Sequence, residues 1–151
     1  MYSIDDFPDY VYNESLYSYQ PGLTEKLNQK AEDDVTQNWI NEIVLWKTNR
    51  YAKLERPVLD LLNDQRILTS EIDKEYTNGV LTHLLKTPGI RLPMASTILR
   101  FRNPHIYQII DKRAYRIATG TPLKLPVYQS ENAIKLTVKL YFDYLERLKQ
   151  I

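Results

Sequence analysis

The sequence predicts an all-α protein, and three observations lead to this prediction. Apolar side chains recur at spacings of three and four residues along most of the chain after residue 22, which is the period of a helix with one buried face. Pairs that break helices, such as Pro88-Gly89 and Asn103-Pro104, separate these segments. No alternating apolar–polar run of comparable length predicts a strand. We therefore expect a compact domain of several helices.

The length of the chain and its first residues set the expected domain organisation. A chain of 151 residues is long enough to bury a substantial core and is by default one domain. Residues 1–22 hold five tyrosines and two prolines without a sustained period, and they end in the turn-forming pair Pro21-Gly22. We expect an N-terminal arm over residues 1–22 and a single helical domain over residues 23–151.

The first predicted helices are placed by amphipathic spacing and by capping residues. Residues 23–33 form a polar amphipathic segment, and Thr36 can cap the helix that follows. Trp39 and Trp46, seven residues apart, fall on one face of that helix. Such a face is most often part of a core, although a tryptophan at the edge of a cleft can also stack on a base.

Two further helices are expected before the middle of the chain, and a third follows them. Pro57 suits the first turn of a helix that runs to residue 63. Thr69 or Ser70 can cap a short helix containing Tyr76. A separate helix is expected over about residues 78–86, where apolar residues line one face.

The last three helices are expected at 93–102, 111–118 and 131–150. Thr87-Pro88-Gly89 ends the preceding helix, and Pro93 then lies in the first turn of the next. Asp111 can cap the helix that it begins, and Ser130 can cap the long closing helix.

The charges of the chain are divided unequally between its halves. Residues 1–75 have a net charge of −7 and residues 76–151 a net charge of +8. Between Glu75 and Glu131 there are eight basic residues and one acid, Asp111. A surface made from the basic half favours a polyanion, of which nucleic acid is the commonest. The alternative is that the two halves pair with each other across the fold.

Several classes of protein are excluded by composition. The absence of cysteine excludes disulfides, thiolate zinc sites and a cysteine-ligated iron–sulfur cluster. Two histidines, His83 and His105, are too few for a histidine-rich metal site, so we expect no metal unless carboxylates hold it, and no other cofactor. No apolar run reaches the roughly 20 residues of a membrane span, and the acidic first residues do not resemble a signal peptide. We expect a cytoplasmic protein.

Residues 85–99 carry the pattern that points to a function. Two apolar helical segments are joined by a tight turn in which Gly89 allows a positive φ. The second segment begins with unpaired backbone N–H groups, beside the small residues Ala95 and Ser96, and such a helix start can hold a phosphate. The segment is thus predicted to be a helix–hairpin–helix that grips a DNA backbone without reading its sequence.

At this point the sequence resembles the helix–hairpin–helix DNA glycosylases, which include endonuclease III, the adenine-mismatch glycosylases and oxoguanine glycosylase. The hairpin residues that match the family are Pro88, Gly89, Ile90, Ala95, Ile98 and Leu99. Beyond the hairpin the family has a catalytic aspartate after two or three apolar residues, and Asp111 follows Ile109 and Ile110 at the family's usual distance. The resemblance covers about 35 residues.

The resemblance implies a glycosylase-like fold, double-stranded DNA as the partner and Asp111 as the catalytic carboxylate. The residues that it implies for DNA binding are Thr87, Gly89, Arg91, Met94, Ala95, Ser96, Arg100, Lys112 and Arg113. The candidates for a pocket that receives the base are Trp39, Trp46, Tyr107 and Gln108.

Two departures from the family pattern narrow the expected chemistry. Arg91 replaces the second glycine of the hairpin, and it can add a phosphate contact. Pro93 occupies the position of the lysine that forms a Schiff base in bifunctional members, and it has no side-chain amine. The implied activity is therefore that of a monofunctional glycosylase that removes a damaged or modified base without a lyase step.

Two other interpretations remain open from the sequence. Asp111 can be a helix cap only, in which case the protein is a non-catalytic helix–hairpin–helix DNA-binding module. The chain can also be a small interaction protein whose acidic and basic halves pair, with no role in nucleic-acid binding.

Overall fold

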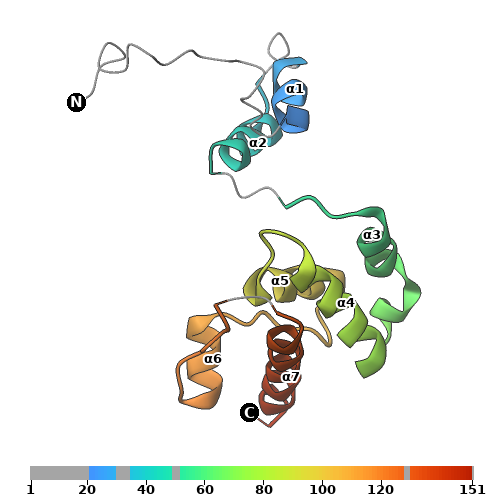
Figure 1. The fold of residues 1–151 in the computed structure, drawn as a ribbon, viewed down its shortest axis with the longest axis vertical. Coiled ribbons are helices and arrows are strands. Elements are labelled where there is room, and N and C mark those ends of the chain that lie inside the picture. The colour runs from blue at the N-terminus through green and yellow to red at the C-terminus, as the bar shows by residue number, and fades with distance from the viewer. Residues whose placement is uncertain (1–20, 30–34, 49–51, 128–129, 151) are drawn as a thin grey trace, which may run out of the picture. The chain divides into compact units, whose positions relative to one another are not determined.

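A computed structural model of the chain describes residues 21–29, 35–48, 52–127 and 130–150. These residues contain seven α-helices and one 3-10 helix, and none of them is in a strand (Figure 1). The prediction of an all-α protein is confirmed. None of the helices in the described ranges is both long enough and apolar enough to cross a membrane.

The chain divides into two compact units, residues 1–51 and residues 52–151, and each is described by itself. The expectation of one domain over residues 23–151 stays a prediction. The expected N-terminal arm lies outside the described residues except for Pro21 and Gly22, which begin a helix rather than form a separate turn.

The first unit contains helices α1 (Pro21–Gln29) and α2 (Gln37–Thr48), which pack against each other. Thr36 caps α2 as predicted, because its hydroxyl accepts the N–H of Trp39 at 3.2 Å. The indole N–H of Trp46 donates to the Thr24 hydroxyl at 2.8 Å, which joins the two helices. Leu23 is buried, whereas no side chain of α2 is.

The second unit contains α3 (Arg56–Asn63), the 3-10 helix η3 (Gln65–Leu68), α4 (Lys74–Lys86), α5 (Leu92–Arg102), α6 (Lys112–Thr119) and α7 (Glu131–Leu148). Helix α4 packs against α3, α5 and α7, and α6 packs against α7. Figure 1 shows α7 between α4 and α6. Helices α4 and α7 therefore form the centre of this unit.

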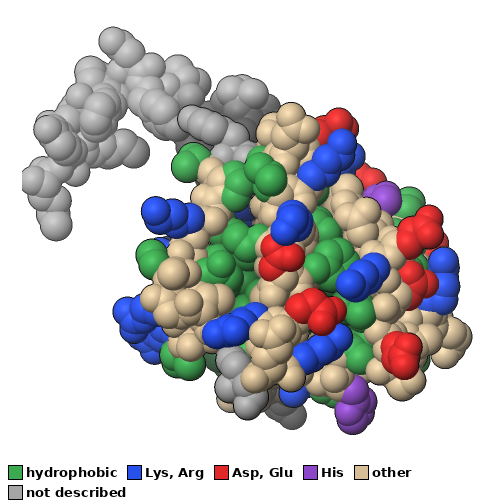
Figure 2. Space-filling model, turned by 90° about the horizontal axis from the view of Figure 1, so that it is seen from below, with side chains coloured by type: hydrophobic (Ala, Val, Ile, Leu, Met, Phe, Trp, Pro, Cys, Tyr) green, Lys and Arg blue, Asp and Glu red, His purple; other side chains and the backbone are tan. Residues whose placement is uncertain are grey.

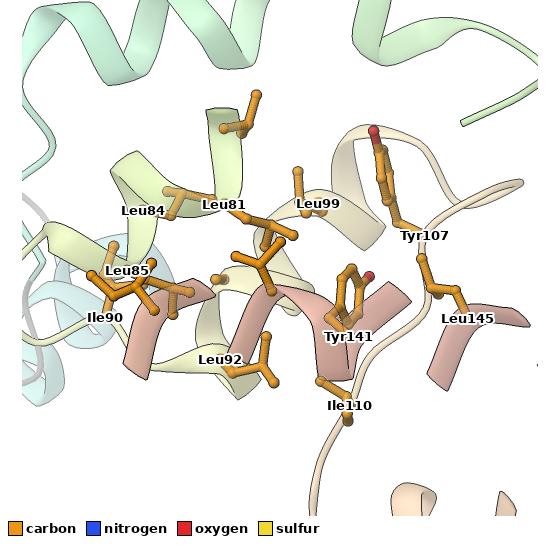
Figure 3. Close-up of a cluster of buried hydrophobic side chains, with 14 of the residues drawn as sticks. Leu81, Leu84, Leu85, Ile90, Leu92, Leu99, Tyr107, Ile110, Tyr141 and Leu145 are labelled. Atoms are coloured by element: carbon orange, nitrogen blue, oxygen red, sulfur yellow. The ribbon is translucent and has the colours of Figure 1, made fainter. Parts of the chain in front are cut away.

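The core of the second unit lies where α4, α5 and α7 meet (Figure 3). Leu81 and Leu84 of α4, Leu99 of α5 and Tyr141 of α7 are each fully buried. Burying a side chain of this size stabilises the folded state by about 1.5–3 kcal/mol, so this cluster fixes how the three helices pack. The turn between α4 and α5 and the start of α6 are thereby attached to a packed core.

One prediction about the helices is wrong. The sequence suggested a short helix capped by Thr69 or Ser70 and a separate helix over residues 78–86, whereas the structure has one helix, α4, from Lys74. Asp73 caps α4 by accepting the N–H of Tyr76 at 2.9 Å. The Thr69 hydroxyl instead donates to backbone carbonyls, that of Glu71 at 2.7 Å among them, and so belongs to a turn.

Four buried tyrosines make the stability of the second unit depend on pH. Burial raises the pKa of Tyr76, Tyr107, Tyr141 and Tyr144 above its usual value. In the unfolded chain these phenols lose their protons near pH 10, while the folded protein keeps them, so the free energy of unfolding falls as the pH rises further. We expect a loss of up to about 1.4 kcal/mol per pH unit for each tyrosine. Urea unfolding at about pH 8, 10 and 11 measures this slope, and Tyr141→Phe should make it shallower.

Candidate nucleic-acid interface

The turn between α4 and α5 is tight and exposed. The N–H of Thr87 donates to the Leu84 carbonyl at 3.0 Å, which ends α4, and the N–H of Ile90 donates to the Thr87 carbonyl at 3.1 Å. Gly89 has φ = +82°, a backbone conformation that side chains with a Cβ rarely adopt. Pro88 and Gly89 are both exposed, whereas Ile90 is buried. The turn thus projects from the unit while its last residue anchors it.

The start of α5 presents free backbone donors. No described residue provides a hydrogen-bond acceptor for the N–H groups of Leu92 and Met94, and Pro93 between them has no N–H. Arg91, the N-cap residue, makes no side-chain cap, and its guanidinium donates to the Val127 carbonyl at 2.9 Å. Because the helix dipole adds positive potential at this end, an anion can be held there.

Three of the predicted DNA-binding residues have buried side chains. Thr87 donates through its hydroxyl to the His83 carbonyl at 3.1 Å, Ala95 is fully buried, and Ser96 bonds within the unit. Met94 is 47% exposed on the outer side of α5. Of the predicted DNA-binding residues between Thr87 and Ser96, Gly89, Arg91 and Met94 are therefore the ones that a ligand can reach.

Most of the cations between Glu75 and Glu131 have no acidic partner among the described residues. Residues 52–151 carry 16 basic and 10 acidic side chains, a net charge of +6. Among the described residues, Lys86 is the one member of the eight cations between Glu75 and Glu131 that has an ion-pair partner, Glu131 at 3.9 Å. The other ion pairs of the unit join residues of α3, η3, α4 and α7 and the residues beside them. Within the described residues, internal pairing does not account for this group of cations.

Helix α6 carries three exposed members of this group of cations. Lys112, Arg113 and Arg116 are all exposed, while Ala118 on the opposite side is buried. In Figure 2, Lys and Arg side chains occur without acidic neighbours along the left side of the unit, whereas acids and bases alternate toward the right. Arg100 on α5 is half-buried. We use the name α6 cationic face for Lys112, Arg113 and Arg116.

Asp111 is the N-cap of α6, as predicted, and it is exposed. Its Oδ1 accepts the N–H of Arg113 at 2.8 Å and the N–H of Ala114 at 2.7 Å. Within the described part of the chain no hydrogen bond or ion pair reaches its Oδ2. Capping therefore occupies one carboxylate oxygen and leaves the other open to solvent, so the cap and a chemical role are compatible.

The four predicted pocket residues are divided between the two units. Tyr107 is 1% exposed, and its hydroxyl lies 2.8 Å from that of Thr77, so its ring is part of the core. Gln108 is half-buried and its side chain donates to the Pro104 carbonyl at 3.2 Å. Trp39 and Trp46 belong to the first unit, and their role beside Asp111 stays a prediction.

Two pockets of the second unit lie near these residues. One, of about 540 Å³, has Gln108 and His105 in its wall, together with the C-terminal part of α7. The other, of about 300 Å³, is formed by Arg91 and the segment 125–127 beside α7. Asp111 lines neither pocket. In the described residues no group of three or more His, Asp or Glu side chains is placed to hold a metal ion.

Two features of this site were not predicted from the sequence. Arg116 lies one turn after Arg113 on the exposed side of α6, a spacing that could have been recognised. Tyr141 and Tyr144 donate to the backbone just before Asp111, and no sequence signal shows this.

Together these features describe an all-α protein in which one helix, α6, starts at an exposed carboxylate and carries an exposed cationic face. No protein-family model, no curated protein and no solved structure matches the chain.

Proposed function

We propose that this protein binds double-stranded DNA through the phosphate backbone and removes a damaged or modified base from it by hydrolysis, without a lyase step. The observation that carries the proposal is the α6 cationic face, which follows Asp111 directly and has no acidic partner among the described residues. Exposed cations of this kind release counterions when they contact phosphates, which is the main source of affinity for DNA. The free N–H groups at the start of α5 supply a second phosphate contact.

Asp111 is the group that would take part in the chemistry. The bond between base and sugar breaks through an oxocarbenium-like sugar, and a carboxylate beside the ring stabilises that cation or orients the attacking water. The C1′–N bond breaks, a C1′–O bond forms with water, and the departing base receives a proton. The open Oδ2 of Asp111 is the atom available for this role. Pro93 supplies no amine for a Schiff base, which supports simple hydrolysis.

A DNA-binding module without catalysis is the second candidate, and one observation favours it. A base that leaves the stack needs a pocket, and neither of the two pockets found near these residues is lined by Asp111. Incubation of the protein with duplexes that each carry one damaged or modified base, followed by alkali cleavage at abasic sites, distinguishes the two candidates. Release from at least one duplex supports the glycosylase, and release from none leaves the binding module.

The binding itself is tested by the salt dependence of the affinity. A steep decrease of log K with log salt is expected, because each phosphate contact contributes about −0.9 to the slope. If the protein fails to bind duplex DNA even at low salt, both candidates are wrong, and a protein with no nucleic-acid role is left.

The α6 cationic face gives the sharpest test of where DNA binds. Replacement of Lys112, Arg113 and Arg116 by glutamine should weaken binding at least about 10-fold at moderate salt and make the salt slope shallower by about 2.7. The matched control replaces Lys74, Lys139 and Lys149, which have ion-pair partners, and so changes the net charge equally. Fluorescence anisotropy with a labelled duplex measures the affinity of each variant and its salt slope. Equal weakening by the two triple variants would mean that the net charge, not this face, attracts DNA.

A further inference from the structure

The four residues before Asp111 form a strap that is held by side-chain hydroxyls from two helices, α5 and α7. We define the strap as residues 107–110, which are in neither helix nor strand. Its backbone groups therefore need partners outside regular structure. Tyr141 donates to the Gln108 carbonyl at 2.9 Å, and Tyr144 donates to the Ile109 carbonyl at 3.0 Å. Figure 3 shows Tyr107, Ile110 and Tyr141 within one buried cluster.

The last bond of the strap comes from Ser96 in α5. The Ile110 N–H donates to the Ser96 hydroxyl at 3.1 Å, and the same hydroxyl donates to the Pro93 carbonyl at 2.9 Å. Ser96 is 0% exposed, so water does not compete for either bond. One buried oxygen atom thus connects the first turn of α5 to the residue immediately before Asp111.

We propose that Ser96 is a positioning residue, which fixes the Asp111 carboxylate relative to the start of α5. This inference rests on the proposed function, in which the start of α5 holds a phosphate and Asp111 acts on the sugar. Both groups must then meet the same DNA strand at a set separation, and a misplacement of about 1 Å can reduce a rate 100-fold. Asp111 follows Ile110 directly, so a shift of the Ile110 N–H moves the cap of α6 with it.

Thr97 provides a matched control for Ser96. Its hydroxyl donates to the same Pro93 carbonyl, at 2.8 Å, but makes no contact with the strap. Thr97→Ala therefore removes only a hydrogen bond to the Pro93 carbonyl. Ser96→Ala removes the equivalent hydrogen bond from Ser96 to Pro93 and also the hydrogen bond between Ser96 and Ile110. A property that changes in Ser96→Ala but not in Thr97→Ala therefore depends on the hydrogen bond between Ser96 and Ile110.

The first measurement needs no activity. Amide hydrogen exchange followed by NMR reports on Arg113 and Ala114, whose N–H groups bond to Asp111. Ser96→Ala should speed their exchange several-fold, Ser96→Thr should restore it because the hydroxyl is kept, and Thr97→Ala should leave it unchanged. Unchanged exchange in Ser96→Ala would show that Ser96 does not hold Asp111, and it would overturn the inference whether or not the protein is an enzyme.

The second measurement separates positioning from a purely structural role. In single-turnover base release, Ser96→Ala should lower the rate constant about 30- to 100-fold while the Kd for duplex DNA stays within about 3-fold of wild type. A rate equal to that of Thr97→Ala would overturn the inference. If the wild type releases no base, the proposed glycosylase activity fails, and the exchange data still decide whether Ser96 holds Asp111. If Ser96→Ala does not fold, Ser96→Cys fills the same space with a poor acceptor and takes its place.

Discussion

Asp111→Asn is expected to lower the rate of base release at least about 100-fold while the protein stays folded and bound to DNA. The two backbone N–H groups that bond to Asp111 need only one acceptor oxygen, and the amide oxygen of asparagine is an equally good N-cap. The substitution therefore removes the negative charge and keeps the helix start. Affinity for duplex DNA should rise slightly, if it changes, because a negative charge leaves a cationic surface.

Two further variants separate the charge of Asp111 from its capping role. Asp111→Ala removes both, so it should lower the free energy of unfolding by about 1 kcal/mol as well as the rate. Asp73→Asn makes the same chemical change at the cap of α4, where Asp73 accepts the N–H of Tyr76 at 2.9 Å. This variant should release base at the wild-type rate.

Rates of base release under single-turnover conditions, with urea unfolding of each variant, check these results. If Asp111→Asn releases base as fast as the wild type, Asp111 is a cap only, and its carboxylate has no part in the reaction. A loss of rate in Asp111→Ala alone would lead to the same conclusion, because that variant differs from Asp111→Asn in losing the cap.

Local features of the helices were predictable from the sequence because capping depends on residues only a few positions apart. Thr36, Asp111 and Ser130 cap helices as expected; the Ser130 hydroxyl accepts the N–H of Ala133 at 3.3 Å. Pro57 and Pro93 lie in the first turns of α3 and α5. The boundaries of these helices differ from the predicted ones by one or two residues.

Contacts between distant residues could not be predicted, because they depend on which backbone groups the packing of helices brings together. Tyr107 was a candidate to stack on a base, yet packing against α4 places its hydroxyl 2.8 Å from that of Thr77. Ser96 was chosen as a small residue beside a phosphate, whereas its hydroxyl bonds to the strap. The sequence around Tyr107 and around Ser96 has no pattern that distinguishes these buried residues from exposed ones.

Asn103 is a further residue whose role appears only in the folded chain. In the sequence it was half of a helix-breaking Asn-Pro pair, while in the structure it is 4% exposed. Its amide donates to the carbonyls of Ile67 and Thr69, both at 2.9 Å, and its side-chain oxygen accepts the N–H of His105 at 3.1 Å. It therefore joins η3 and the residue that follows it to the end of α5.

Asn103→Ala should lower the free energy of unfolding by about 2–4 kcal/mol, because it leaves three backbone groups without their side-chain partner in a buried place. Asn103→Asp keeps the shape but places a carboxylate against two carbonyl oxygens, so it should be at least as destabilising at neutral pH. Gln108→Ala, which loses one bond to the Pro104 carbonyl, should stay within about 0.5 kcal/mol of wild type. Urea unfolding measures all three.

The same substitution tests whether the end of α5 contributes to the site. Asn103 lies at the start of the segment that leads through the strap to Asp111, and its carbonyl accepts the N–H of Tyr107 at 3.2 Å. If the bonds from Tyr141, Tyr144 and Ser96 are sufficient to hold the strap, Asn103→Ala should destabilise the unit yet leave the exchange of Arg113 and Ala114 close to wild type while it is folded. Faster exchange at those two amides would instead show that the strap is positioned from both of its ends.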